Sequence, residues 1–326
     1  MENLKICLTT YIYGDKYQEY IPLLVYSINK AYPHYTIMLF LHGAINENVK
    51  TILEESGLDK NVIFKEYHFH DCPNMSPLKS MALRWVLWDD SFMTYDYLYI
   101  VDIDMFYIKE PEPLHVQHIQ HMRLTGLPFD NMRRIYRSDN HSFFSILRRI
   151  KYAGLRSIVN YWMNSEPEYR LTGLHFIDVK KYYSVFTYDL IKKYCADIYD
   201  NRWFEYVMSP DNEILLAMIC KQLGFSIEKL AIQSDFVTSL DFKNFTRPEF
   251  RPHHGIHMGI FRNSIEQIQE NSLLRSILES EVYKYYISVY KEKMLQDSLL
   301  TNIIDSSSDN IKDLFVRMNE YYQLLK

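Results

Sequence analysis

Two aspartates separated by one residue follow directly on an apolar run that favours a strand. The run Tyr97–Val101 leads into Asp102-Ile103-Asp104. In an extended chain, residues i and i+2 point to the same side, so both carboxylates can approach one point. They repel each other there unless a cation lies between them, and such hard oxygen ligands suit Mg²⁺ or Mn²⁺ beside phosphate oxygens. The spacing alone also fits a strand cap followed by a turn.

Three histidines within five positions are candidates for a further ligand. They lie in the run His253-His254-Gly255-Ile256-His257-Met258-Gly259. A lone histidine is more often a hydrogen-bonded structural residue, but three beside glycines that allow close backbone approach fit a binding site equally well. Imidazole beside carboxylates favours Mn²⁺ over Mg²⁺.

Alternating strands and helices are expected to position the two aspartates. The expected strands cover residues 4–10, 37–41, 62–67 and the run before Asp102, and the expected helices cover 18–32, 46–56 and 77–88. This alternation predicts an α/β fold with a mostly parallel central sheet, which binds ligands at the carboxyl ends of its strands. Thr9 and Thr10, at the end of the first strand, should therefore share a crevice with Asp102 and Asp104. No Gly-x-Gly-x-x-Gly follows the first strand, so a dinucleotide site of the Rossmann type is not expected.

Further elements are expected downstream. Residues 171–179 favour a strand that leads into a helix from Lys180, and Ser209-Pro210-Asp211-Asn212-Glu213 has the cap, proline and acids of a helix start. Residues 264–326 favour two or three amphipathic helices with a loop at 306–309. Packing onto the domain or a partner is the simplest interpretation of these helices, and peripheral membrane contact is the alternative.

Composition and charge narrow the class of protein. A net charge of −5 argues against a nucleic-acid partner. The four cysteines form no C-x-x-C pair, which fits a reducing compartment. The N-terminus does not resemble a signal peptide and no apolar run has the length of a membrane span, so a cytoplasmic location, with peripheral membrane contact as an option, is expected. The basic stretch 123–156 fits either a solvated helical face or a surface for a phosphorylated acceptor or an anionic membrane.

The order of these motifs resembles glycosyltransferases of the GT-A fold, closest to family eight, the glycogenin and lipopolysaccharide galactosyltransferase group. The resemblance covers roughly residues 4–262. The end of the family's opening strand corresponds to Thr9-Thr10, and the turn after it corresponds to Asp15-Lys16-Tyr17. The family's arginine on the helix before the D-x-D strand corresponds to Arg84, and the D-x-D motif itself corresponds to Asp102-Ile103-Asp104. Its Asn-Ala-Gly strand corresponds to Leu171-Thr172-Gly173, and its Lys-Lys-aromatic helix start corresponds to Lys180-Lys181-Tyr182. Its Asp-Gln pair corresponds to Asp211-Asn212, and its late His-Gly-basic motif corresponds to His257, Gly259 and Arg262.

The resemblance implies roles for individual residues. The implied donor-binding residues are Thr9, Thr10, Tyr11, Tyr17, Arg84, Asp102, Ile103, Gly173 and Arg262. The implied ligands for Mn²⁺ or Mg²⁺ are Asp102, Asp104 and His257, with His254 as the alternative because His257 stands one residue closer to its glycine than the family spacing. Asp211 and Asn212 would lie near the reacting carbon. Leu171 replaces an asparagine that touches the donor sugar, and the usual Lys-Pro-Trp is absent, so the identity of the sugar does not carry over.

The implied activity is metal-dependent transfer of a hexose from a nucleotide diphosphate sugar, with a UDP-sugar and a retaining mechanism favoured. The acceptor would be a hydroxyl of a glycan, lipopolysaccharide-type glycolipid or protein. The implied organisation is a catalytic domain over 1–262, with a donor-binding half (1–115), the basic variable segment 123–156 and an acceptor-side half (157–262), followed by a helical extension over 263–326. Two interpretations compete with this one. A sugar nucleotidyltransferase shares the sheet and metal chemistry but normally has a glycine-rich basic loop after its first strand, and a glycan- or membrane-binding module would use the acidic pair only structurally.

Overall fold

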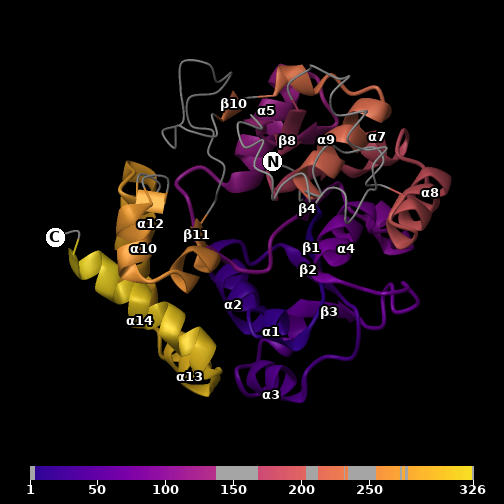
Figure 1. The fold of residues 1–326 in the computed structure, drawn as a ribbon. Coiled ribbons are helices and arrows are strands. Elements are labelled where there is room, and N and C mark those ends of the chain that lie inside the picture. Colours follow the sequence, from indigo (N-terminus) through magenta and orange to yellow (C-terminus); the bar gives the residue numbers. More distant parts are fainter. Residues whose placement is uncertain are drawn as a thin grey trace.

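A central six-stranded sheet organises the chain (Figure 1). The computed structural model describes residues 4–136, 168–202, 212–230, 232–233, 255–271, 274–275 and 278–324. The strand order is β3-β2-β1-β4-β9-β6, with β1 at Ile6–Ile12, β2 at Thr36–Leu41, β3 at Val62–Lys65, β4 at Tyr97–Ile100, β9 at His175–Asp178 and β6 at Phe129–Asp130. The first four strands in sequence are parallel, whereas β9 runs antiparallel to both β4 and β6. The predicted α/β fold with a mostly parallel central sheet is therefore confirmed.

The first strand shows how the sequence produces a layered fold. Every residue of β1 is buried, as expected of a parallel strand that is covered on both faces. Ile6, Leu8 and Ile12 belong to one hydrophobic core, and Cys7 and Tyr11 belong to a second. Because side chains alternate across a strand, the two cores lie on opposite faces of the sheet.

The helices of the first half largely follow the expected ranges. They are α1 (Asp15–Gln18), α2 (Ile21–Ala31), α3 (Glu47–Glu55) and α4 (Pro77–Leu83). The predicted helix over 18–32 corresponds to α2, which begins at Ile21 with a proline in its first turn, and the short helix α1 precedes it. The predicted helix over 77–88 is also shorter. It ends at Leu83 and tightens into a 3₁₀ turn over Arg84–Val86.

A second, smaller sheet lies beyond β9. It consists of β10 (Ile232–Gln233), β7 (Arg133–Tyr136) and β8 (Glu168–Leu171). The predicted strand over 171–179 is divided between β8 and β9. Its glycine, Gly173, lies in the break between them. The helices of this half are α5 (Leu114–Thr125), α7 (Val179–Tyr183), α8 (Tyr188–Tyr199) and α9 (Asn212–Gln222).

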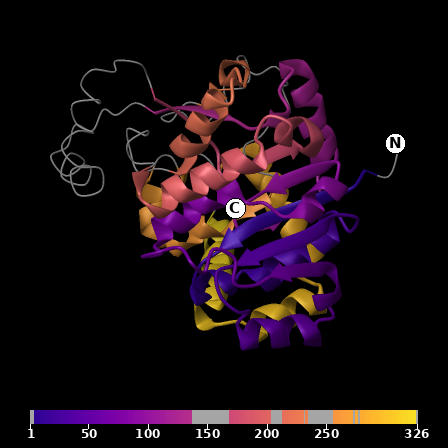
Figure 2. The same cartoon turned by 90° about the vertical axis from the view of Figure 1, so that its right-hand side faces the viewer.

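The C-terminal helices cover one face of the central sheet. They are α10 (Ile265–Glu270), α12 (Glu281–Val289), α13 (Ser298–Ser306) and α14 (Asp309–Leu324), and α12 continues into a π-helical turn over Tyr290–Met294. They lie along α2 in Figure 1 and behind the parallel strands in Figure 2, and they contribute to the same hydrophobic core as α2. Packing onto the domain thus accounts for their apolar faces. Of the helices that the structure describes, none combines the length and the apolarity needed to cross a bilayer.

A short strand connects this helical layer to the aspartates. β4 ends at Ile100, and Asp102-Ile103-Asp104 forms a turn that leads into β5 (Met105–Tyr107). β5 pairs antiparallel with β11 (Gly255–His257), with His257 opposite Met105. The two aspartates therefore lie in a short turn between β4, a strand of the central sheet, and β5, which pairs with β11. As predicted, they follow directly after the apolar strand.

Candidate active site

A pocket of about 240 Å³ lies at the carboxyl ends of β1 and β4. Nine of the residues predicted from the sequence line it, namely Thr10, Tyr11, Tyr17, Arg84, Asp102, Ile103, Asp104, His257 and Arg262. They come from parts of the chain as far apart as the first strand and the segment after β11. The carboxyl-end rule for parallel sheets accounts for the location.

Asp102 is bound by the arginine that precedes its strand. Arg84, which is buried, forms an ion pair with Asp102 and also donates to the Val101 carbonyl oxygen at 3.4 Å. Its guanidinium lies over the Trp85 ring at 4.3 Å. The 3₁₀ turn at the end of α4 places Arg84 at the pocket and Trp85, which is buried, beside it.

The first residue of α9 extends this contact. Asn212 Oδ1 accepts a hydrogen bond from Arg84 Nη2 at 3.3 Å and another from Trp85 Nε1 at 3.2 Å. Arg84 thus connects Asn212 to Asp102, because its guanidinium binds both side chains. Its predicted partner Asp211 lies outside the described residues.

Asp104 is bound by a second arginine. Arg262 Nη2 donates to Asp104 Oδ2 at 3.1 Å, and Arg262 Nε donates to the Tyr20 hydroxyl at 3.1 Å. The guanidinium also lies 5.5 Å from the centre of the Tyr17 ring. Burial disfavours the charged arginine, but the bonds to Tyr20 and Asp104 outweigh it and raise the pKa of Arg262. Arg262 is therefore held charged beside Asp104.

His257 approaches the same carboxylate from the other side. Its Nε2 lies 3.7 Å from Asp104 Oδ1. The backbone fixes this approach, because Met258 N donates to the Asp104 carbonyl oxygen at 2.8 Å and His257 N donates to the Tyr283 hydroxyl at 3.3 Å. The alternative ligand, His254, lies outside the described residues.

Two glycines make room for the acidic pair. A Cβ on Gly173 would overlap the Asp102 carboxylate, and a Cβ on Gly259 would lie 2.5 Å from Asp104 Oδ2 and 2.7 Å from His257 Cε1. Neither glycine needs a positive φ angle. Close approach of the side chains, rather than backbone conformation, therefore explains both glycines.

The residues present fit a hard divalent cation in part. Asp104 and His257 offer an oxygen and a nitrogen 3.7 Å apart, a separation that a cation with bonds of about 2.1 Å spans. Within the described ranges, however, no three His, Cys, Asp or Glu side chains are grouped closely enough to enclose a metal ion. Asp102 could become a third ligand only by exchanging its bond to Arg84.

The residues around the pocket differ from the predicted set in both directions. Thr9 is fully buried in β1 and is not among the residues that line the pocket. Sequence reasoning did not single out Tyr13, Ser80, Met81 or Tyr20, of which the first three line the pocket and the last binds Arg262. The tyrosine-rich stretch after β1 was the available signal for Tyr13 and Tyr20.

The basic stretch 123–156 is described only as far as Tyr136. In that part Arg133 is buried, with its guanidinium 4.7 Å from the centre of the Tyr169 ring. Arg133 therefore contributes to packing. The rest of the stretch lies outside the described residues.

No family model and no curated protein matches the sequence. Solved structures that resemble the chain include the mannosyltransferase Ktr4p from S. cerevisiae in complex with GDP, at 9% identity over 70% of this chain and 69% of that chain, with a TM-score of 0.44. Another is the galactosyltransferase LgtC with donor and acceptor sugar analogues, at 16% identity over 66% and 70%, with a TM-score of 0.36. A third is core-mannan synthase A from Aspergillus fumigatus in an Mn/GDP form, at 9% identity over 70% and 72%, with a TM-score of 0.44. The similarity is remote, so the chemistry has to come from the residues of the pocket.

Proposed function

We propose that this pocket binds the diphosphate of a nucleotide sugar, with a UDP-sugar favoured, and that the protein transfers the hexose to an acceptor hydroxyl. One observation carries the proposal. The Asp102-Ile103-Asp104 turn lies at the carboxyl edge of a parallel sheet, with two guanidinium groups and an imidazole directed at it. The acceptor class proposed is a glycan, a glycolipid or a protein.

The charges of the pocket suit a metal and a diphosphate together. The two carboxylates are balanced by Arg84 and Arg262, so the pocket is close to neutral as it stands. A divalent cation alone would add two positive charges, and the diphosphate of a nucleotide sugar alone would add two negative ones. Bound together they leave the balance unchanged. We therefore expect metal and nucleotide to bind cooperatively.

Asp104, His257 and Asp102 are the residues that would hold Mn²⁺, or Mg²⁺ as the alternative. When bound, such an ion acts as a Lewis acid that stabilises the negative charge on the departing diphosphate. The imidazole of His257 favours Mn²⁺.

The arginines supply the remaining stabilisation of the leaving group. A planar guanidinium matches phosphate oxygens as well as it matches carboxylates. Arg84 is fixed by Trp85 and Asn212, and Arg262 is fixed by Tyr20, so both charges are oriented before the donor binds. Groups that are already oriented need little reorganisation as charge develops in the transition state. Because the departing diphosphate is stabilised by cations, no general acid is required.

Retention of anomeric configuration is the favoured outcome, on the resemblance to family eight. Asp211 or Asn212 would then lie near the reacting carbon of the sugar and would act either as the nucleophile or as a group that stabilises positive charge on that carbon. The bond from Arg84 to Asn212 supports a position of Asn212 beside the donor phosphates.

A thermal-shift screen and a turnover assay test the proposal. A thermal-shift screen of nucleotide sugars with Mn²⁺ should identify the donor, because a ligand of the native state raises the apparent stability. Asp104→Ala should abolish Mn²⁺-dependent hydrolysis or transfer of that donor while the protein stays folded. Undiminished turnover in the folded variant would refute the proposal.

A non-catalytic glycan-binding module is the second candidate. The observation in its favour is that each carboxylate already has a guanidinium partner and could be structural. Titration with UDP, with and without Mn²⁺, separates the two candidates. Metal-dependent nucleotide binding supports the transferase, and its absence supports the module.

A further inference from the structure

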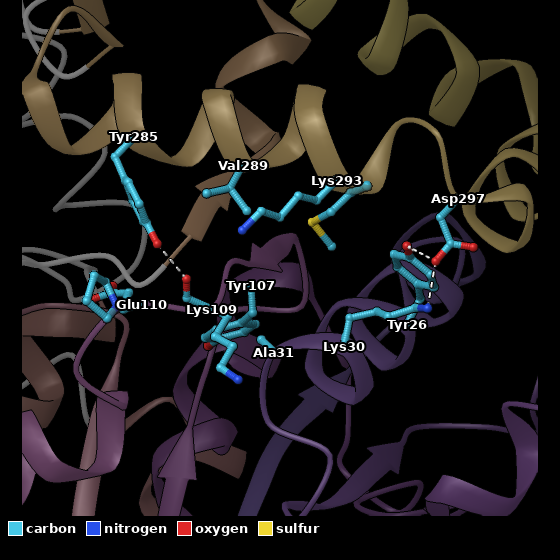
Figure 3. Close-up of a pocket in the computed structure, with 12 residues that line it drawn as sticks. Tyr26, Lys30, Ala31, Tyr107, Lys109, Glu110, Tyr285, Val289, Lys293 and Asp297 are labelled. Atoms are coloured by element: carbon cyan, nitrogen blue, oxygen red, sulfur yellow. Dashed lines mark hydrogen bonds and ion pairs between the residues drawn. The ribbon is translucent and has the colours of Figure 1, made fainter.

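A second pocket, of about 400 Å³, lies at the other end of α2 (Figure 3). Tyr20, just before α2, contacts Arg262 in the first pocket, whereas Lys30 and Ala31, at the end of α2, line the second. The opposite wall comes from α12 and the π-helical turn that follows it. The volume is within the range of small-molecule sites.

The carboxylates in its wall are already satisfied. Asp297 forms an ion pair with Lys30 at 2.7 Å and accepts a hydrogen bond from the Tyr26 hydroxyl at 3.0 Å. Glu110 is buried and accepts hydrogen bonds from the Tyr286 hydroxyl at 2.7 Å and from Gln117 Nε2 at 2.6 Å. Both acids hold the wall together; Asp297 is neutralised by Lys30, whereas the donors to Glu110 are neutral and leave its charge in the lining.

Two lysines of the lining carry uncompensated charge. Lys109 follows β5 and Lys293 lies on the π-helical turn, so they reach the pocket from different elements, below and above it in Figure 3. Both are exposed, and neither has a carboxylate within ion-pair distance in the part of the chain that the structure describes. The three lysines and two carboxylates of the lining leave it a net charge of +1, and in a protein with a net charge of −5 a positive cavity favours an anionic ligand.

The backbone that carries Lys293 is unusual. A π-helical turn over Tyr290–Met294 continues α12, and such turns are rare and often lie at functional sites. The turn contributes both a charge, Lys293, and an apolar side chain, Met294, to the pocket. With Ala31 and Val289, Met294 forms an apolar part of the lining beside the lysines.

We propose that this pocket binds a phosphate ester with an apolar body. A phosphate monoester carries up to two negative charges at neutral pH, which two ammonium groups can balance, and lysine binds phosphate as a point charge. The apolar body would contact Ala31, Val289 and Met294. The ester could be a free metabolite or a lipid headgroup, which share this chemistry. The site is separate from the first pocket and does not depend on its proposed function.

Titration of the full chain with phenyl phosphate tests the site. We expect saturable binding by calorimetry, and the double variant Lys109→Gln/Lys293→Gln should weaken it by about tenfold or more, since two charge-assisted bonds are lost. The matched control Lys50→Gln/Lys60→Gln removes the same charge from exposed positions outside the pocket and should leave the affinity unchanged. Val289→Trp fills the apolar side without changing charge and should also weaken binding.

A second arm identifies the source of the ester. Vesicles of four parts phosphatidylcholine to one part phosphatidic acid are sedimented with the wild-type and variant proteins. Binding of phenyl phosphate without vesicle binding supports a free ester, and vesicle binding that needs Lys109 and Lys293 supports a lipid. Absence of saturable binding to both probes, or equal loss in the Lys50→Gln/Lys60→Gln control, would overturn the proposal.

Discussion

Arg317, on the last helix of the chain, donates a hydrogen bond to the carbonyl oxygen of Arg262 at 2.9 Å across 55 residues. The same guanidinium lies 3.4 Å from the carbonyl oxygen of Phe261. A side chain of α14 thus holds the backbone of the arginine that binds Asp104. Tyr283, on α12, holds His257 in a similar way. The C-terminal helices therefore support one wall of the first pocket.

Removing the Arg317 guanidinium should weaken nucleotide binding without unfolding the protein. Arg317→Met keeps most of the apolar stem but loses bonds that are each worth about 1 kcal/mol, so Mn²⁺-dependent affinity for UDP should fall by about fivefold to tenfold. Calorimetry measures the affinity and thermal unfolding checks the fold. Arg275→Met is the control, because Arg275 also donates to a carbonyl oxygen, but that of Gln269, which unlike Arg262 does not line the pocket. Equal affinities in the wild type and Arg317→Met would contradict the positioning role.

Replacing Arg84 should have opposite effects on the affinity for the metal and the affinity for the nucleotide. Arg84→Met frees the Asp102 carboxylate from its ion pair, so the nucleotide-free protein should bind Mn²⁺ more tightly, by about tenfold for a partly buried charge pair. UDP should bind more weakly to the metal-loaded protein, because a cation facing the diphosphate is lost. Titrations with Mn²⁺ alone and with UDP at saturating Mn²⁺ provide both values. Weaker Mn²⁺ binding in this variant would mean that Arg84 only maintains the structure.

Gly259→Ala should damage the proposed metal site through a single methyl group. The new Cβ would lie 2.5 Å from Asp104 Oδ2 and 2.7 Å from His257 Cε1, so a ligand side chain has to move. We expect Mn²⁺-dependent UDP affinity to fall by about tenfold to a hundredfold, as when a metal ligand loses its orientation. Gly43→Ala is the matched control, since no heavy atom lies within 4 Å of its added Cβ. An unchanged affinity in Gly259→Ala would exclude a shared role of Asp104 and His257.

Away from the pocket, a buried aspartate between two histidines should be important for stability. Asp130 is fully buried and bonds to His118 Nδ1 at 2.6 Å and to His121 Nδ1. Burial raises the pKa of Asp130, but the two histidines outweigh it and lower the value to about 2. Asp130→Asn should reduce the free energy of unfolding by about 3 kcal/mol, because the histidines lose a buried charged partner. Urea denaturation measures this loss, and Asp305→Asn, at an exposed position of α13, should change it little.

The sequence predicted those features that depend on local pattern. Buried strands such as Ile6–Ile12 and the link from β4 into Asp102 follow from apolar runs, and the parallel arrangement follows from their alternation with helices. The parallel arrangement also predicted that Thr10 would lie beside Asp102 at the carboxyl edge of the sheet, and both residues line the pocket. The histidine cluster indicated His257, and the resemblance added Arg84 and Arg262.

The sequence could not predict which groups would satisfy the carboxylates. The ion pair between Arg84 and Asp102 joins residues 18 positions apart, and that between Arg262 and Asp104 joins residues 158 positions apart. Such pairings depend on the packed geometry and leave no periodic pattern. Arg317, which is half-buried, was missed for the same reason, since the pattern of an amphipathic helix gives no signal that one arginine reaches a distant backbone carbonyl.

Acid should destabilise the protein well before its carboxylates are protonated. Burial lowers the pKa of His175 to about 3, partly opposed by the charge of Asp130, and lowers the pKa of His68 and of His115 to about 4. In the unfolded chain these histidines have a pKa of about 6.5, so between that value and about pH 4 the unfolded state binds more protons and stability falls as the pH falls. For His175, which is 1% exposed, the loss approaches about 1.4 kcal/mol per pH unit below pH 6. Urea midpoints at pH 7 and pH 5 should show the decrease, and His175→Phe, which keeps an aromatic ring but cannot take up a proton, should make the slope shallower. A slope identical to that of the wild type would mean that His175 is not a source of the acid sensitivity.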